Sequence, residues 1–269
     1  MKKILTLLLG VVFLAVLYLG QSHWNEQQQA AKGAEKVVKQ ESADVQGEEA
    51  ADDSSTEKLL ALTKNWPADA VEQLKVSLEE KKPFKILFVG SPAIGSKETG
   101  PFADVKARLV KAFGEEHIEV GLHTYDSTST QFLKDSQEDE IAAEAADLIV
   151  LEPLILKNND AGVTNNTLTD LRKIVDEVKT VVPDTSFIIQ PSYPLYKAKN
   201  YPKQVAALKK YAEEQELPYL DHWQAWPDSN SSELKDYMQP DLSAPNEKGN
   251  KLWSDYLTDY LISDGSESE

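Results

Sequence analysis

Short apolar runs alternate with segments of helical periodicity from residue 58 onward, and this alternation strongly constrains the fold. Near-continuous apolar runs predict buried strands, and apolar residues spaced three and four apart predict helices packed on them. The predicted strands are 84–90, 117–125, 148–153, 186–190 and 217–220, and the predicted helices are 101–113, 137–146, 168–182, 201–212 and 252–261. Repeated β–α units form a parallel sheet with helices on both faces. The sequence therefore predicts an α/β fold: a three-layer α/β/α sandwich around a five-stranded, parallel, flavodoxin-like sheet.

The N-terminal residues predict a membrane-directed segment. Lys2 and Lys3 precede the uncharged stretch 4–20, which is just long enough to cross a hydrocarbon core of about 30 Å. Because the basic residues lie on the N-terminal side, the rest of the chain is expected to be exported. Two interpretations of residues 1–22 stay open. They form either a retained single-pass anchor in the cell membrane or a signal peptide whose cleavage would release a secreted protein.

Two polar segments flank the region of alternating pattern. Residues 23–57 contain almost no large apolar side chains, and residues 264–269 are similar. Such segments cannot bury enough apolar surface to offset the entropy lost on ordering. We therefore predict a disordered polar linker at 23–57, one folded domain at 58–263 and a disordered tail at 264–269.

Composition excludes several functions. The chain has 28 Lys and Arg against 45 Asp and Glu, a net charge of −17, which argues against a nucleic-acid partner. It has no Cys, which excludes disulfides, thiolate zinc sites and a cysteine nucleophile. Only four His are present, so a His-rich metal site is not expected. We expect neither a bound metal nor a cofactor.

The carboxyl ends of parallel strands meet at one edge of a sheet, and ligands bind there. That rule brings together the loops 90–100, 125–130, 152–160, 191–196 and 222–226. The first loop begins with GSPAIGS (90–96), which lacks the Lys and the spacing of a phosphate-binding loop. Functional residues are therefore expected at this edge, and the glycines at 90 and 95 are explained by a tight strand-to-helix turn.

Two sequence blocks, ILFVGSPAIG near the first strand and PNEKGNKLW before the last helix, resemble the SGNH/GDSL hydrolases. In that family a strand–GDS turn presents the nucleophilic serine, and a D-x-x-H-P-N-x-x-G block supplies Asp and His. The resemblance covers about residues 84–262. It implies the SGNH-type fold and, for activity, ester or acetyl hydrolysis on a lipid or a cell-envelope polysaccharide.

The sequence departs from that family at two catalytic positions. The position of the family's serine is Pro92 and that of its histidine is Ala244, whereas Asp241 retains the aspartate. Proline has no hydroxyl and alanine has no base, so a serine mechanism needs substitutes from elsewhere.

Candidate substitutes are expected at the same edge of the sheet. Ser91 would be the nucleophile and Asn159 the oxyanion donor, with Asp241 orienting His222 as the base. Ser96 is a second candidate hydroxyl and His123 a second candidate base. Structural alternatives stay open for each: a turn hydroxyl for Ser91, a core histidine beside the tryptophans for His222, and turn or cap roles for Asn159 and Asp241.

Aromatic and acidic side chains offer candidate substrate contacts. Trp223 and Trp226 would stack on a sugar ring, or instead cover the core. Glu152 follows a buried strand, where a carboxylate is costly unless it is paired or solvated. With Asp160 and Asp241 it would form an acid–base or cation-binding group.

Two functions follow. One is an exported, membrane-tethered hydrolase acting on an ester-bearing or glycan substrate of the envelope. The other is a catalytically eroded module of the same fold that binds an envelope glycan or a partner protein.

Overall fold

The computed structural model describes residues 55–263. The predicted anchor or signal peptide at 1–22, the linker residues 23–54 and the tail 264–269 lie outside the described residues. A helix at 55–61 begins ahead of the domain boundary predicted at residue 58. Within residues 55–263, no helix is both long enough and apolar enough to cross a membrane.

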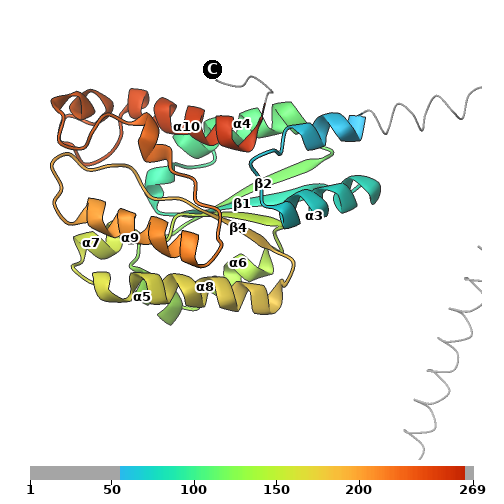
Figure 1. Cartoon of the computed structure of the whole chain (residues 1–269), viewed down its shortest axis with the longest axis horizontal. Coiled ribbons are helices and arrows are strands. Elements are labelled where there is room, and N and C mark those ends of the chain that lie inside the picture. Colours follow the sequence, from blue (N-terminus) through green and yellow to red (C-terminus); the bar gives the residue numbers. More distant parts are fainter. Residues whose placement is uncertain (1–54, 264–269) are drawn as a thin grey trace, which may run out of the picture. The chain divides into compact units, whose positions relative to one another are not determined.

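Four parallel strands form the central sheet (Figure 1). They are β1 (Phe84–Gly90), β2 (Ile118–Thr124), β3 (Leu148–Leu151) and β4 (Ser186–Ile189), in the order β2-β1-β3-β4. Every residue of β3 and β4 is buried, as expected for strands covered on both faces. The predicted parallel α/β sheet is confirmed.

The predicted fifth strand is reduced to a single bridge between Ile189 and Tyr219, so the sheet has four strands rather than five. The Ile189 N–H donates to the Pro218 carbonyl and the Leu220 N–H donates to the Ile189 carbonyl, both at 2.8 Å. Pro218 has no N–H to extend this pairing. The chain then enters the 3₁₀ helix η4 (His222–Ala225), which ends the pairing.

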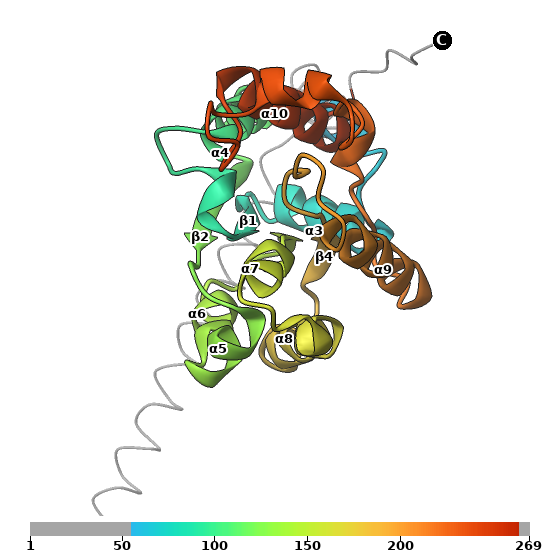
Figure 2. The ribbon, with the colours of Figure 1, turned by 90° about the vertical axis from the view of Figure 1, so that its left-hand side faces the viewer.

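Helices cover both faces of the sheet, and Figures 1 and 2 show the three layers. They are α3 (Ala68–Glu79), α4 (Pro101–Phe113), α5 (Ser129–Lys134), α6 (Gln137–Ala143), α7 (Ile155–Asp160), α8 (Thr167–Val181), α9 (Tyr201–Glu214) and α10 (Glu247–Leu261). Helices α4 and α10 lie side by side on one face, joined by Arg108–Asp255 (2.9 Å) and by Ser254–Asp104 (2.6 Å). Helices α5, α6 and α8 pack together on the other face. Helices α5 and α7 are too short to show a period in the sequence, and they were not predicted.

The PNEKG block fixes the start of α10. The Asn246 side chain caps the helix by accepting from the Gly249 N–H at 3.1 Å. Gly249 packs so closely against the 3₁₀ helix η5 (Ser232–Tyr237) that a β-carbon would collide with the Tyr237 carbonyl oxygen. The glycine thus permits close contact between α10 and η5, a structural reason for this part of the motif.

Candidate functional site

The ends of β1 and β3 are joined by a buried serine–carboxylate pair. Ser91 directly follows β1, and its hydroxyl and N–H both donate to Glu152 Oε2, at 2.8 and 3.0 Å. Their side chains are only 2% and 1% exposed. Gly90 allows this approach, because a β-carbon there would lie 2.9 Å from the Glu152 side chain. The structure therefore brings together two residues that the sequence placed at this edge without pairing them.

Glu152 lies in an environment that disfavours its charge. Burial raises the pKa of the Glu152 carboxyl, and hydrogen bonding to Ser91 and the proximity of the Ser192 hydroxyl oppose this rise. Within the described residues, Glu152 Oε1 and the buried hydroxyls of Ser192 and Tyr201 form no hydrogen bond of normal geometry. The carboxyl thus stands at the centre of an incompletely satisfied polar cluster.

His222 is a buried core histidine packed beside the tryptophans, which is the structural alternative to a catalytic base. Its side chain is 0% exposed and stacks on Trp253 with the ring centroids 4.8 Å apart. Nδ1 accepts from the Trp226 indole N–H at 3.1 Å, so the neutral ring carries its proton on Nε2 and donates to the Pro191 carbonyl at 2.8 Å. Burial lowers the pKa of His222 to about 4. Both nitrogens are occupied, so this conformation leaves none to accept a proton from Ser91.

Asp241 does not contact His222 either. Asp241 is exposed and accepts from the Ser243 N–H (3.1 Å) and hydroxyl (2.7 Å), bonds that lower the pKa of its carboxyl. Asp241 thus has the turn role expected as the structural alternative to catalysis. The second candidate base, His123, contacts Glu144 at 2.9 Å, and the second hydroxyl, Ser96, lies 3.1 Å from Glu98. The predicted catalytic set is therefore not assembled as a triad.

Tyr193 links the loop before α10 to the segment that follows β4. Its hydroxyl donates to the Ser243 carbonyl at 2.6 Å, which ties the 241–246 loop to the segment after β4. Burial and the negative charges of Asp160, Glu152 and Asp241 raise the pKa of Tyr193 to about 12. The loop before α10 and the end of β3 thus border the same edge of the sheet. Within residues 55–263, no three acidic or histidine side chains are grouped closely enough to hold a metal ion.

The two tryptophans brace this edge. Trp226 is 6% exposed, with its indole N–H bound to His222, so it covers the core rather than offering an open stacking face. Trp223 is partly exposed, donates to the Ser192 carbonyl at 2.7 Å and packs against Tyr201. Of the two tryptophans, Trp226 thus has the core-covering role rather than the sugar-stacking one.

Asn159 lines a polar hollow of about 400 Å³. The hollow lies between α7 and α9, two helices that contact each other. We call this the amide hollow; its lining residues are Asn159, Gly162, Thr164, Asn200, Lys203 and Gln204. Asn159 Oδ1 accepts from Gln204 Nε2 at 3.3 Å. Gln204 Oε1 is buried and has no partner among the described residues. Asp160 is exposed at the end of α7.

The neighbouring Asn158, which was not predicted as a site residue, has a structural role. It is fully buried, accepts from the Ser129 N–H at 2.9 Å, and donates to the hydroxyls of Ser129 (2.8 Å) and Thr167 (2.7 Å). Ser129 in turn donates to Asp170 at 2.8 Å. This network fixes α7 against α5 and α8, which leaves Asn159 facing the hollow.

Comparison with known proteins identifies the fold. Neither a protein-family model nor a curated protein matches the sequence. A protein from Desulfitobacterium hafniense, described as lipolytic and of the G-D-S-L family, is similar in structure (TM-score 0.53, 16% identity, 65% of this chain and 98% of that one). A GDSL-like lipase from Parabacteroides merdae gives a TM-score of 0.56 at 14% identity, over 67% of this chain and 96% of its own.

An acetylxylan esterase from Geobacillus stearothermophilus gives a TM-score of 0.55 at 18% identity, over 70% of this chain and 98% of its own. At these identities the likeness concerns the fold. The domain thus has the SGNH/GDSL hydrolase fold, as the sequence resemblance predicted.

Proposed function

We propose that the chain is an exported, membrane-tethered protein whose SGNH-fold domain binds a glycan of the cell envelope without serine–histidine catalysis. The observation that carries this proposal is the amide hollow. Three carboxamides and a threonine line it, and within residues 55–263 the buried Oε1 of Gln204, one of these carboxamides, has no hydrogen-bond partner. Carboxamides and hydroxyls both donate and accept, as the hydroxyl groups of a sugar require. The similar structure described as an acetylxylan esterase supports a glycan as the ligand class.

The geometry at Ser91 and His222 favours binding over hydrolysis. A serine nucleophile needs a base that takes its proton and an open path to the substrate. His222 uses both ring nitrogens elsewhere, and Ser91 is 2% exposed. The family's serine and histidine positions, Pro92 and Ala244, supply neither group.

Replacing Gln204 is expected to weaken glycan binding about tenfold, since one hydrogen bond to a ligand is commonly worth that much. The full chain, in detergent micelles, is first screened on an array of acetylated and unacetylated oligosaccharides. Affinity for the ligand found is then measured by calorimetry for wild type and Gln204→Leu. Gln215→Leu, the same change at an exposed position outside the hollow, is the matched control. The proposal would be contradicted if no oligosaccharide on the array binds, or if Gln204→Leu and Gln215→Leu bind the ligand with equal affinity.

Ester hydrolysis is the second candidate, and the Ser91–Glu152 hydrogen bond favours it. In that mechanism Glu152 would act as the base in place of histidine. The full chain and a Ser91→Ala variant, both in detergent micelles, are treated with p-nitrophenyl acetate and a fluorophosphonate probe. The results decide between glycan binding and ester hydrolysis. Binding without catalysis predicts no labelling and turnover equal to that of Ser91→Ala. Labelling that Ser91→Ala abolishes would establish the enzyme.

Tethering has its own test. Residues 2–20 have the charge and length expected of a retained anchor. Cell fractionation is expected to recover the full-length chain with the membranes. Recovery of a shortened chain only in the medium would show cleavage and contradict tethering.

A further inference from the structure

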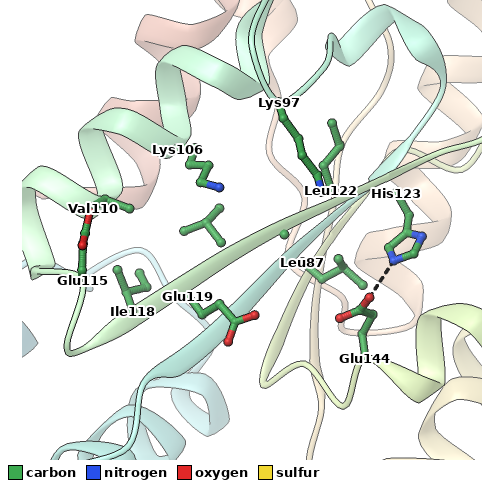
Figure 3. A pocket seen from close by; sticks show the side chains of 12 residues that line it. Leu87, Lys97, Lys106, Val110, Glu115, Ile118, Glu119, Leu122, His123 and Glu144 are labelled. Atoms are coloured by element: carbon green, nitrogen blue, oxygen red, sulfur yellow. Dashed lines mark hydrogen bonds and ion pairs between the residues drawn. The ribbon is translucent and has the colours of Figure 1, made fainter.

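A groove of about 550 Å³ runs along the free edge of β2 (Figure 3). We call it the edge groove. All of residues 118–123 line it, together with Leu87, Lys97, Lys106, Val110, Glu115 and Glu144. Side chains alternate between the faces of a strand, so a groove over one face would contact every second residue. A run of consecutive residues shows instead that the strand's backbone edge lies in the groove.

The register of β2 determines which backbone groups this edge offers. The Phe84 N–H donates to the His117 carbonyl and the Tyr125 N–H donates to the Gly90 carbonyl, at the two ends of the β1–β2 pairing. In a parallel pair only alternate residues of each strand bond to the neighbour. Glu119, Gly121 and His123 therefore turn their backbone groups toward β1. Val120 and Leu122 turn theirs toward the groove, where a further strand would pair with them.

Side chains on the two sides of β2 differ in charge. Figure 3 shows Lys97, Lys106 and Leu122 on the α4 side. Neither lysine forms an ion pair within residues 55–263, in a chain that carries 45 acidic residues. The acids on the other side are already paired. Glu144 contacts Lys85 at 2.7 Å and His123 at 2.9 Å, and Glu119 lies 3.7 Å from Lys85.

The side opposite the lysines has a gap at Gly121, between Glu119 and His123. Gly121 has no side chain, and a β-carbon there would lie 3.0 Å from Leu87 Cδ1. Leu87 is fully buried yet lines the groove. An apolar side chain from an added strand would pack over Gly121 in this gap. The next residue of that strand would point to the α4 side.

We propose that the edge groove binds an extended peptide of a partner protein, added as a strand beside β2, with acidic and apolar side chains alternating. The acidic residues lie on the α4 side near Lys97 and Lys106, and the apolar residues lie over Gly121. Glu115, at the Val110 end of the groove, keeps the acidic residues at the lysine end. This site is separate from the amide hollow and does not depend on the function proposed there.

Selection of random peptides displayed on phage against the immobilised full chain tests the proposal. The expected products alternate acidic and apolar residues, and the selected peptide slows hydrogen exchange at the Val120 and Leu122 amides, followed by NMR. The Gly121 and His123 amides, which face β1, are expected to exchange slowly with and without peptide. Failure to select such peptides would overturn the proposal. Slow exchange at Val120 and Leu122 in the free chain would assign the groove to the chain's own residues and would overturn it too.

Variants separate backbone pairing from side-chain contact. Leu122→Pro removes an outward N–H at the sheet edge, where proline is tolerated, and is expected to weaken peptide binding at least tenfold. Leu122→Ala keeps that N–H and is the matched control. Lys97→Glu combined with Lys106→Glu leaves the strand unchanged and is expected to weaken binding to a similar extent. Unchanged affinity in both Leu122→Pro and the double lysine variant would overturn the proposal.

Discussion

His222→Ala is expected to lower the free energy of unfolding by about 3 kcal/mol or more at pH 7.5, the scale for emptying a buried aromatic site. The change leaves the indole N–H of Trp226 and the carbonyl of Pro191 without their partner and removes the ring stacked on Trp253. Each lost buried hydrogen bond adds about 1–3 kcal/mol to the cost of the cavity. Urea unfolding followed by tryptophan fluorescence measures the effect.

The same residue is expected to make the domain sensitive to acid. Burial lowers the pKa of His222 from 6.5 to about 4, so the folded state binds fewer protons than the unfolded state between these values. The stabilisation is therefore present above pH 6.5 and is lost as the pH falls toward 4. The difference in pKa corresponds to about 3 kcal/mol. Unfolding curves at pH 7.5, 6 and 5 measure this loss.

His222→Gln is the control for this pH dependence. Glutamine retains one acceptor and one donor near the two ring nitrogens but does not titrate. Its unfolding free energy is expected to change less between pH 7.5 and 5 than that of wild type. An equal loss in both proteins would show that His222 is free to protonate in the folded state. His222 would then again be a candidate base for Ser91.

The periodic segments of the sequence predicted the fold well. The spacing of Phe102, Val105, Leu109 and Phe113 predicted α4 with the bounds that the structure shows, because the helix buries that one face. Strand β1 is also confirmed at its predicted bounds, because its apolar run crosses the centre of the sheet. The prediction of a fifth strand was wrong. A proline at the sheet edge and the turn into η4 prevent strand pairing there, despite the short apolar run.

The sequence predicted where the site residues lie, but not which of them contact each other. Parallel topology brings Ser91 and Glu152 to one edge, yet only the packed structure shows that Gly90 lets the carboxyl reach the serine. Asn158 and Asn159 look alike in sequence, and only the packing of α7 decides which is buried. Gln204 belongs to the polar side of a helix, where no spacing marks it as a site residue. Residue types near strand ends thus predict location, whereas roles depend on contacts between segments distant in sequence.

Glu152→Ala is expected to lower the free energy of unfolding by about 2–4 kcal/mol at pH 7.5, whereas Glu152→Gln retains or raises it. Alanine leaves both donors of Ser91, its N–H and its hydroxyl, buried without an acceptor and opens a void beside Gly90. Glutamine keeps a carbonyl oxygen for Ser91. Its amide group can donate to the hydroxyls of Ser192 and Tyr201, which form no hydrogen bond of normal geometry in the described structure.

The pH dependence of the Glu152 variants runs opposite to that of His222. Burial raises the pKa of Glu152 above 4.5, so the folded state holds the proton more tightly than the unfolded state. This contribution to stability is complete below pH 4.5 and is lost as the pH rises through the folded pKa. Glu152→Gln removes that loss, so its advantage over wild type is expected to grow from pH 5 to 8 in urea unfolding. If glutamine instead destabilises the domain as much as alanine does, the folded state depends on an ionised carboxylate at the end of β3. A base beside Ser91 would then be present, and ester hydrolysis would become the better explanation of this edge.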